Sequence, residues 1–306
     1  MSLRPISRIS RPQEVIDGDG VKIHRVFGHD ETSVTDPFLM LDHLENNDPV
    51  HFMPGFPWHP HRGIETITYV LDGGVEHQDS LGNRGTLGAG DVQWMTAGSG
   101  IIHQEMPHKG SGPIFHGFQL WSNLPAEKKM TDPRYQDIPA GEIPEIIDDD
   151  GSKVRLITGK FWGKTGPVSG IATDPRFLDI TIPPRTKRRF KVLLDDNAFA
   201  YVFSGSGYFK DGSTPFPVQT EYVTEKGVSD TIRSHPVENR NLVLFDRGEE
   251  IFVESGDFGL RFLLVSGQPL KEPVAWHGPI VMNTRQELIL AFEEYQNGTF
   301  LKKKNE

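Results

Sequence analysis

The most informative absence from this sequence is cysteine. None of the 306 residues is a cysteine, which excludes disulfides, thiolate zinc or iron–sulfur sites and cysteine nucleophiles. Any metal ion must therefore be held by imidazole and carboxylate groups. A chain without thiols tolerates either redox setting, but the absence of disulfides leads us to expect a cytoplasmic protein, or a nuclear one if the source is eukaryotic.

Long apolar runs and an excess of basic charge are also missing. No stretch has the length of a signal-peptide core or of a membrane span, so we expect no membrane partner. The net charge is −10, from 32 Lys and Arg against 42 Asp and Glu. Because affinity for nucleic acid comes mainly from basic side chains that neutralise phosphates, we expect no direct nucleic-acid binding.

Glycine and proline, in contrast, are abundant. The chain has 32 glycines and 23 prolines, which fits many short strands joined by turns better than a helical bundle. Its length is sufficient for two domains of ordinary size. The composition therefore predicts an all-β protein with two domains.

Two histidine motifs stand out, W-H-P-H-R-G-I-E-T at 58–66 and I-I-H-Q-E-M-P at 101–107. Side chains of an extended strand alternate between its faces, so His59 and His61 share one face, as do His103 and Glu105. If the two strands face each other, three imidazoles and a carboxylate surround one divalent transition metal and leave positions open for water, oxygen or substrate. A chance H-x-H pair is a real alternative in a chain with twelve histidines, but the second pair favours a metal site.

The strand pattern continues through both halves of the chain. A D-G-D-G turn at 17–20 predicts a hairpin, and the strand-like runs up to 125 predict an antiparallel barrel or double-sheet jelly roll. The pattern breaks after Pro125, so we place a metal-binding domain at 1–134, a linker at 135–150 and a second domain at 151–306. The second domain repeats the strands and glycine turns without an H-x-H pair. His235 and His277 are isolated there, and we do not expect them to be ligands.

The last segment has a helical pattern. Thr284 followed by Glu287 is a capping-box signature, and Leu288, Ala291, Phe292 and Tyr295 recur at helical spacing. We expect one C-terminal helix packed on the sheet.

Several motifs together resemble those of the pirin family, within the cupin superfamily. They are D-P-F-L-M-L-D (36–42), H-P-H-R-G-I-E-T (59–66), I-I-H-Q-E-M-P (101–107), Q-L-W-S-N-L-P (119–125), and G-Q-P-L-K-E-P-V with G-P-I-V-M-N-T (267–284). The resemblance implies a bicupin, in which two jelly-roll β-barrels pack face to face and the N-terminal barrel holds one Fe(II). Its ligands would be His59, His61, His103 and Glu105.

The carboxylate ligand has a second candidate. General cupins take it from the pattern H-x-H-x-x-x-E, which fits Glu65, and simple alternation puts Glu65 on the face of the two histidines. The pirin pattern instead takes the residue two positions after the third histidine, which is Glu105. We favour Glu105 and expect Glu65 to be a structural residue or a carboxylate that orients a metal-bound histidine.

The resemblance also implies a function. A non-haem iron dioxygenase would use molecular oxygen to open a flavonol such as quercetin, and Glu105 would be a ligand that can also take the proton of the substrate hydroxyl. Apolar walls would come from Phe38, Met40, Phe56, Trp58 and Trp121, for which core packing is an equally good interpretation.

Two alternatives stay open at this point. The protein could be a non-catalytic, metal- and redox-dependent partner of a transcription regulator or metabolic enzyme, or flavonols could be surrogates for another substrate. The ligand set itself accepts Mn, Co, Ni, Cu or Zn as well as iron.

Overall fold

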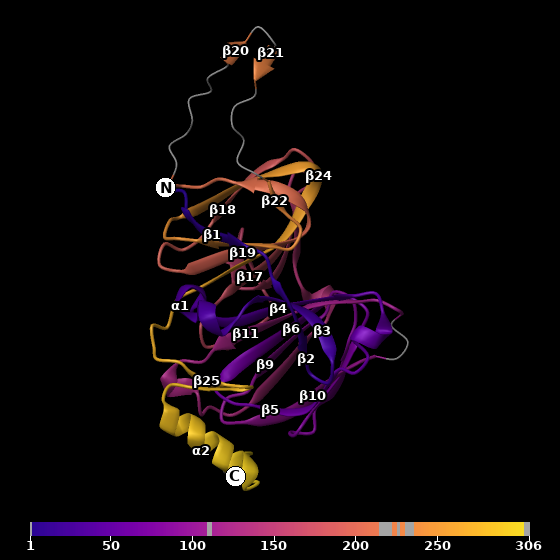
Figure 1. The fold of residues 1–306 in the computed structure, drawn as a ribbon, viewed down its shortest axis with the longest axis vertical. Helices are drawn as coiled ribbons and strands as arrows, with labels where there is room; N and C mark the ends of the chain where they lie inside the picture. The colour runs from indigo at the N-terminus through magenta and orange to yellow at the C-terminus, as the bar shows by residue number, and fades with distance from the viewer. Residues whose placement is uncertain (1, 109–111, 214–221, 225–226, 230–235, 303–306) are drawn as a thin grey trace. The chain divides into compact units, whose positions relative to one another are not determined.

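The computed structural model describes residues 2–108, 112–213, 222–224, 227–229 and 236–302 (Figure 1). The chain forms two compact units. The N-terminal unit comprises Pro12–Pro144, Leu156–Arg176 and Gly267–Glu306, and the C-terminal unit comprises Met1–Arg11, Glu145–Arg155 and Phe177–Ser266.

The N-terminal unit is built on two antiparallel sheets. The larger has seven strands in the order β12 (Arg134–Ile138), β9 (Val92–Thr96), β6 (Ile64–Asp72), β11 (Phe115–Asn123), β4 (Phe38–Asn46), β3 (Val21–Phe27) and β2 (Gln13–Asp17). The smaller has four strands in the order β5 (Phe56–His61), β10 (Ile101–Pro107), β7 (Val75–Asp79) and β8 (Arg84–Leu87).

A shared core packs the two sheets face to face. Buried Ile23, Leu44 and Val70 of the larger sheet form one cluster with Val75 and Leu87 of the smaller. Ile23 and Val75 alternate along their strands with polar neighbours, whereas β4 and β6, which carry Leu44 and Val70, are buried on both faces. The hairpin predicted around the D-G-D-G turn is confirmed as β2 and β3.

Short elements connect these strands. They are η1 (His29–Glu31), α1 (Thr32–Thr35), η2 (Pro49–His51), η3 (Ala126–Lys128), η4 (Ala140–Glu142) and the small hairpin of β15 (Lys160–Phe161) and β16 (Lys164–Thr165).

The C-terminal unit contains one sheet of nine strands. Its main path is β1 (Ile6–Ser10), β23 (Asn241–Phe245), β19 (Asn197–Phe209), β24 (Glu250–Gly267), β17 (Arg176–Ile182), β14 (Lys153–Thr158) and β13 (Glu145–Ile147). Off this path, β18 (Lys187–Lys191) pairs with β24 and β22 (Val237–Glu238) pairs with β19, and a separate hairpin is formed by β20 (Tyr222–Thr224) and β21 (Gly227–Ser229).

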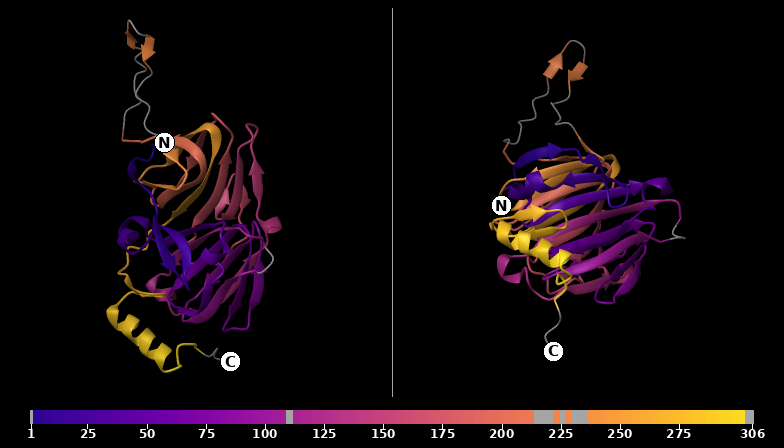
Figure 2. Two further views of the ribbon diagram at one scale, coloured as in Figure 1. Left: turned by 45° about the vertical axis from the view of Figure 1, so that its right-hand side comes forward. Right: turned by 60° about the horizontal axis from the view of Figure 1, so that its bottom comes forward.

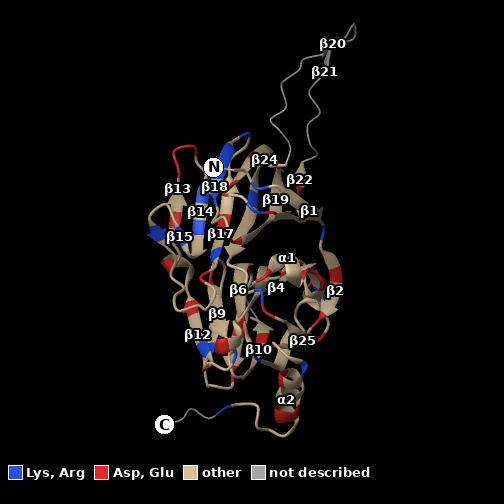
Figure 3. Ribbon diagram, turned by 90° about the vertical axis from the view of Figure 1, so that its left-hand side faces the viewer, with Lys and Arg blue, Asp and Glu red and all other residues tan. Residues whose placement is uncertain are grey.

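Basic residues are concentrated on β18, where Figure 3 colours Lys and Arg blue. Acidic partners meet three of them: Lys187 lies 3.6 Å from Glu254, Arg189 lies 2.9 Å from Glu250, and Arg188 pairs with Asp148. The run K-R-R-F-K is therefore largely compensated and does not form an isolated cationic surface.

The last forty or so residues form an arm that belongs to the N-terminal unit. The C-terminal arm, residues 267–302, holds the hairpin β25 (Ala275–His277) and β26 (Ile280–Met282) and the helix α2 (Arg285–Gln296). Figure 2 shows α2 in yellow beside the strands of that unit. The predicted capping box is confirmed, because the Thr284 hydroxyl accepts from the Glu287 amide and the Glu287 carboxylate accepts from the Thr284 amide.

The domain limits differ from those expected from the sequence. Residues 135–150 are not an unstructured linker, because β12 pairs with β9 and β13 pairs with β14. The helix at the C-terminus, assigned above to the second domain, packs in the N-terminal unit, where Ala291 is buried against Ile280 and Met282. No helix in the described part of the chain is long and apolar enough to cross a membrane.

Candidate metal centre

Three histidines come together on β5 and β10, the first two strands at one edge of the smaller sheet. His59 and His61 lie on β5, and His103 lies on β10 directly opposite His59. Their ligand nitrogens all lie within 4.8 Å of one another, and this is the one such group of three or more His, Cys, Asp or Glu side chains among the described residues. The sequence predicted this convergence from the two-residue spacing of both motifs.

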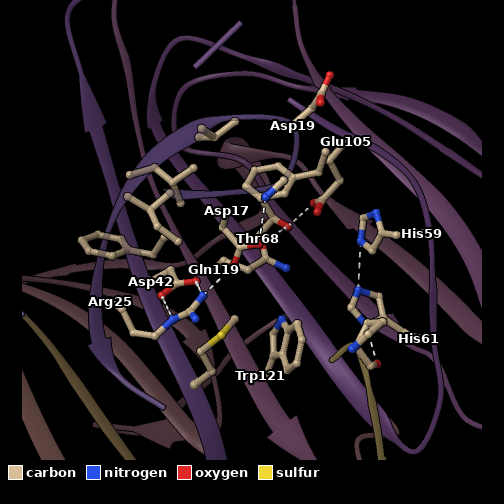
Figure 4. A pocket seen from close by; sticks show the side chains of 18 of the residues that line it. Asp17, Asp19, Arg25, Asp42, His59, His61, Thr68, Glu105, Gln119 and Trp121 are labelled. Carbon is tan, nitrogen blue, oxygen red and sulfur yellow. Dashed lines mark hydrogen bonds and ion pairs between the residues drawn. The ribbon is translucent and has the colours of Figure 1, made fainter. Parts of the chain in front are cut away.

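The hydrogen bonds of His59 and His61 fix which nitrogen of each ring faces the centre. His59 Nδ1 lies 2.8 Å from the carbonyl oxygen of Pro57, and His61 Nδ1 lies 3.0 Å from that of Pro279. A carbonyl can only accept, so each Nδ1 donates, and each neutral ring then keeps a lone pair on Nε2. The two Nε2 atoms lie 3.1 Å apart (Figure 4). Two lone pairs at this distance repel unless a proton or a cation lies between them.

Burial keeps the rings of His61 and His103 neutral. It lowers the pKa of His61 and of His103 well below the ordinary value, and the neighbouring His59 adds to the effect at both. His103 Nε2 is buried and makes no hydrogen bond to the described residues. Three imidazole nitrogens therefore converge, and this donor set fits a divalent transition metal.

Glu105 lies on the same face of β10 as His103, and its carboxylate is held from the opposite sheet. The Thr68 hydroxyl on β6 donates to Glu105 Oε1 at 2.8 Å, and Gln119 Oε1 lies 2.8 Å from the same hydroxyl. Figure 4 shows the carboxylate between Thr68 and His59. Glu105 is thus placed beside the histidine group, although it is not part of the tight cluster of three nitrogens.

Glu65 lies elsewhere, contrary to the alternation argument. It belongs to β6, three positions from Thr68, so the two side chains point to opposite faces of the larger sheet. Its Oε1 accepts from the Thr96 hydroxyl at 2.8 Å, and burial raises its pKa. The chain turns at Gly63, which has a φ of +78°, so the strand phase of the histidines does not continue to Glu65.

A cavity of about 700 Å³ opens beside the histidines. Of the five walls proposed from the sequence, Met40, Phe56 and Trp121 line it, whereas Phe38 and Trp58 do not. A bulge between β5 and β10, where His103 pairs with His59 but Glu105 pairs with Phe56, turns Phe56 inward. Trp58 points away and is 50% exposed, and Phe38 is buried against Gly267.

Sequence reasoning missed a charged cluster at the other end of this cavity. The Arg25 guanidinium donates to both carboxylate oxygens of Asp42 at 2.9 Å and to Asp17 at 2.8 Å (Figure 4). Burial raises the pKa of Asp42 to about 6 despite this pairing. The alternation of V-K-I-H-R-V-F, which puts Arg25 on the face of core residue Ile23, was the available signal.

The C-terminal arm was missed as well. Trp276, His277 and Pro279 line the cavity, and the Pro279 carbonyl is the group that orients His61. His277 lies outside the histidine group, as expected, and His235 lies outside the described residues. The close approach of the arm explains Gly63, because a Cβ there would lie 2.0 Å from the Val281 carbonyl oxygen.

Comparisons with known proteins agree over nearly the whole chain. The family profile described as Pirin matches residues 20–122, and the profile described as Pirin C-terminal cupin domain matches residues 177–301. A pirin-like protein of Caulobacter vibrioides is 39% identical, covering 98% of this chain and 100% of that protein. Pirin-like protein 2 of Arabidopsis thaliana is 40% identical, covering 92% of this chain and 81% of that protein.

A solved structure has the same fold. Quercetin 2,3-dioxygenase from Acinetobacter baumannii superposes with a TM-score of 0.83 at 30% identity, covering 98% of this chain and 99% of that chain. These matches confirm the expected fold of two cupin domains with a C-terminal helix. The chain belongs to the pirin family.

Proposed function

We propose that this protein is a metal-dependent dioxygenase that opens flavonols such as quercetin. The observation that carries the proposal is the convergence of three imidazole nitrogens beside an aromatic-walled cavity. The solved relative named as a quercetin 2,3-dioxygenase supports the choice of substrate class.

His59, His61 and His103 would hold the ion, with Glu105 as the carboxylate ligand, and we propose Fe(II) as the native metal. When bound, such an ion supplies a Lewis acid and a redox partner for dioxygen. The donor set alone admits other divalent metals, so the choice of Fe(II) is part of what the experiment must test.

The remaining work falls to the side chains of the cavity. Trp121 and Trp276, whose ring centroids lie 5.9 Å apart, offer apolar surface to a flat aromatic substrate and keep water from the reacting end. Glu105 is within the cavity and can accept the proton of a substrate hydroxyl. The hydrogen bond from Thr68 fixes the orientation in which it does so.

The test combines metal content with turnover on one sample. Protein loaded anaerobically with Fe(II) is analysed for metal and then assayed for loss of quercetin absorbance and for oxygen uptake. We expect one metal per chain and turnover that depends on it. His61→Ala should abolish both, whereas His51→Asn, at an exposed histidine of the same unit outside the cavity, should change neither.

Two results would contradict the proposal. Turnover that survives His61→Ala would exclude the histidine centre as the reaction site. Stoichiometric metal without turnover across a panel of flavonols would exclude flavonol cleavage and leave a metal-binding protein of another function.

A further inference from the structure

A further buried histidine lies on β7, the strand next to β10. His77 and Asp79 are on β7, which pairs with β10 so that His77 is opposite Glu105 and Asp79 is opposite His103. Directly opposed residues of an antiparallel pair share a face, so all four side chains point into the interior of the barrel. The side chains of His77 and Asp79 are completely buried. Burying these groups is costly unless each has a partner.

Their contacts form a chain that ends at a proposed ligand. His77 Nδ1 lies 3.5 Å from His103 Nδ1, and His77 Nε2 lies 3.7 Å from Asp79 Oδ2, an ion-pair distance. The His77 ring also packs on Tyr135, with ring centroids 4.7 Å apart.

The turn that follows β7 holds Asp79 rigidly. Its Oδ1 accepts from the backbone amides of Leu81 at 2.9 Å and Asn83 at 3.0 Å, and its Oδ2 accepts from the Asn83 side chain at 2.7 Å. Each of these groups donates, so the Asp79 side chain serves as an acceptor. His77 Nε2 makes no hydrogen bond among the described residues, but the acceptor 3.7 Å away favours a hydrogen over a lone pair on this nitrogen.

The position of the hydrogen on His77 decides its position on His103. With its hydrogen on Nε2, neutral His77 has a lone pair on Nδ1, which can only accept from His103. His103 must then carry its hydrogen on Nδ1 and keep the lone pair on Nε2. That is the buried nitrogen without a hydrogen-bond partner among the described residues, next to His59 and His61.

We propose that His77, backed by Asp79, is the positioning residue of the metal centre: it sets the tautomer and the ring orientation of His103. Backbone carbonyls set the tautomers of His59 and His61. His103 takes its support from a side chain, so among the three histidines its support is the one that a point substitution can remove. The inference rests on the proposed metal site, and it adds a residue that the histidine motifs do not contain.

The test separates the hydrogen bond from the packing. His77→Phe keeps a ring against Tyr135 but removes the acceptor, whereas His77→Asn keeps an acceptor near the position of Nδ1 and removes the ring. His43→Phe is the matched control, because His43 is also a fully buried histidine of the N-terminal unit and does not itself line the cavity, although it stacks on Phe118, which does. The affinity for Co(II) is measured by chelator competition, together with the visible absorption of bound Co(II) and the melting temperature of the metal-free protein.

We expect His77→Phe to weaken Co(II) binding about 10- to 100-fold, as is usual when the partner of a metal-bound histidine is lost. Its visible spectrum should change, while His77→Asn stays within a few-fold of wild type and His43→Phe is unchanged in both. Equal affinity and spectrum for His77→Phe and wild type would overturn the inference and leave the metal site standing. A wild-type protein that binds no Co(II) would overturn the metal site itself.

The wild-type protein offers a readout that needs no variant to fold. In the diamagnetic Zn(II)-loaded protein, long-range proton–nitrogen correlation spectra report which ring nitrogen of each histidine is protonated. We expect a hydrogen on Nδ1 of His103 and on Nε2 of His77. The opposite tautomer at either ring would refute the positioning role proposed for His77.

Discussion

Lys129 provides a quantitative test of how the C-terminal arm is fixed to the turn that follows β5. Its ammonium is buried and donates to three acceptors: the Gly63 carbonyl at 2.9 Å, the Asn123 side-chain oxygen at 2.7 Å and the Val281 carbonyl at 3.0 Å. Gly63 follows the H-P-H-R motif, and Val281 belongs to the arm. One side chain therefore joins the two segments, and Lys129→Met removes the junction while keeping the aliphatic stem.

The magnitude follows from two opposing terms. Hydrogen bonds to a charged donor contribute about 1.5–3 kcal/mol each. Burial lowers the pKa of Lys129 from 10.5 to about 8, which corresponds to a cost of about 3 kcal/mol for holding the charge inside the fold. Lys129→Met removes that cost, but it also removes the three bonds and leaves buried acceptors unpaired. We expect the variant to lose about 2–5 kcal/mol of unfolding free energy.

Tryptophan fluorescence is the appropriate probe. All five tryptophans, at positions 58, 94, 121, 162 and 276, lie in the N-terminal unit, so their signal follows the unfolding of that unit in urea. The metal-free protein is used, because a ligand bound only to the folded state would add its own stabilisation. Lys128→Met, at the exposed neighbouring position, is the control. A loss of unfolding free energy below about 1 kcal/mol for Lys129→Met would show that Lys129 does not hold the two segments together.

The same lysine predicts a pH dependence. Its folded-state pKa is below its unfolded value, so between about pH 8 and 10.5 the unfolded chain holds more protons than the folded one. Unfolding free energy rises with pH wherever the unfolded state binds more protons. The stability of wild type relative to Lys129→Met should therefore increase across this range, by up to about 3 kcal/mol. A flat difference would show that Lys129 titrates normally.

Three further predictions concern the cavity and the arm. Thr68→Val should lower kcat for quercetin about tenfold with little change in KM, because it frees the Glu105 carboxylate that the hydroxyl orients; unchanged kcat in steady-state assays would contradict this. Asp42→Asn should cost about 2–4 kcal/mol in urea unfolding, because the half-buried Arg25 loses its two-point partner; a stability equal to wild type would exclude a structural ion pair. Thr284→Ala should cost about 1 kcal/mol through loss of the helix cap, seen as a lower melting temperature, whereas Thr284→Ser should restore it.

Local features of the chain could be predicted from the sequence because they depend on neighbouring residues. The D-G-D-G hairpin, the capped helix after Thr284 and the shared face of His103 and Glu105 each follow from turn chemistry or strand alternation within a few positions. The family resemblance extended this to the whole fold. The histidines could be named because two short motifs repeat one spacing.

The errors at Glu65 and Trp58 have one physical cause, which is that strand alternation holds only within an uninterrupted strand. The turn at Gly63 places Glu65 in a different sheet from His59 and His61, and the bulge in β5 turns Phe56 inward and leaves Trp58 outside. Neither the turn nor the bulge is visible in the two-residue spacing from which side chains are assigned to the faces of a strand.

The sequence by itself determined the kind of site: without cysteine, and with two spaced histidine motifs, it had to be a centre of imidazole and carboxylate. Only the tertiary structure decided what surrounds it. The partners of the ligands are Pro279 for His61, His77 for His103 and Thr68 for Glu105. These contacts join strands and an arm far apart in the chain, because packing two sheets around one core fixes them, and local sequence does not encode that packing.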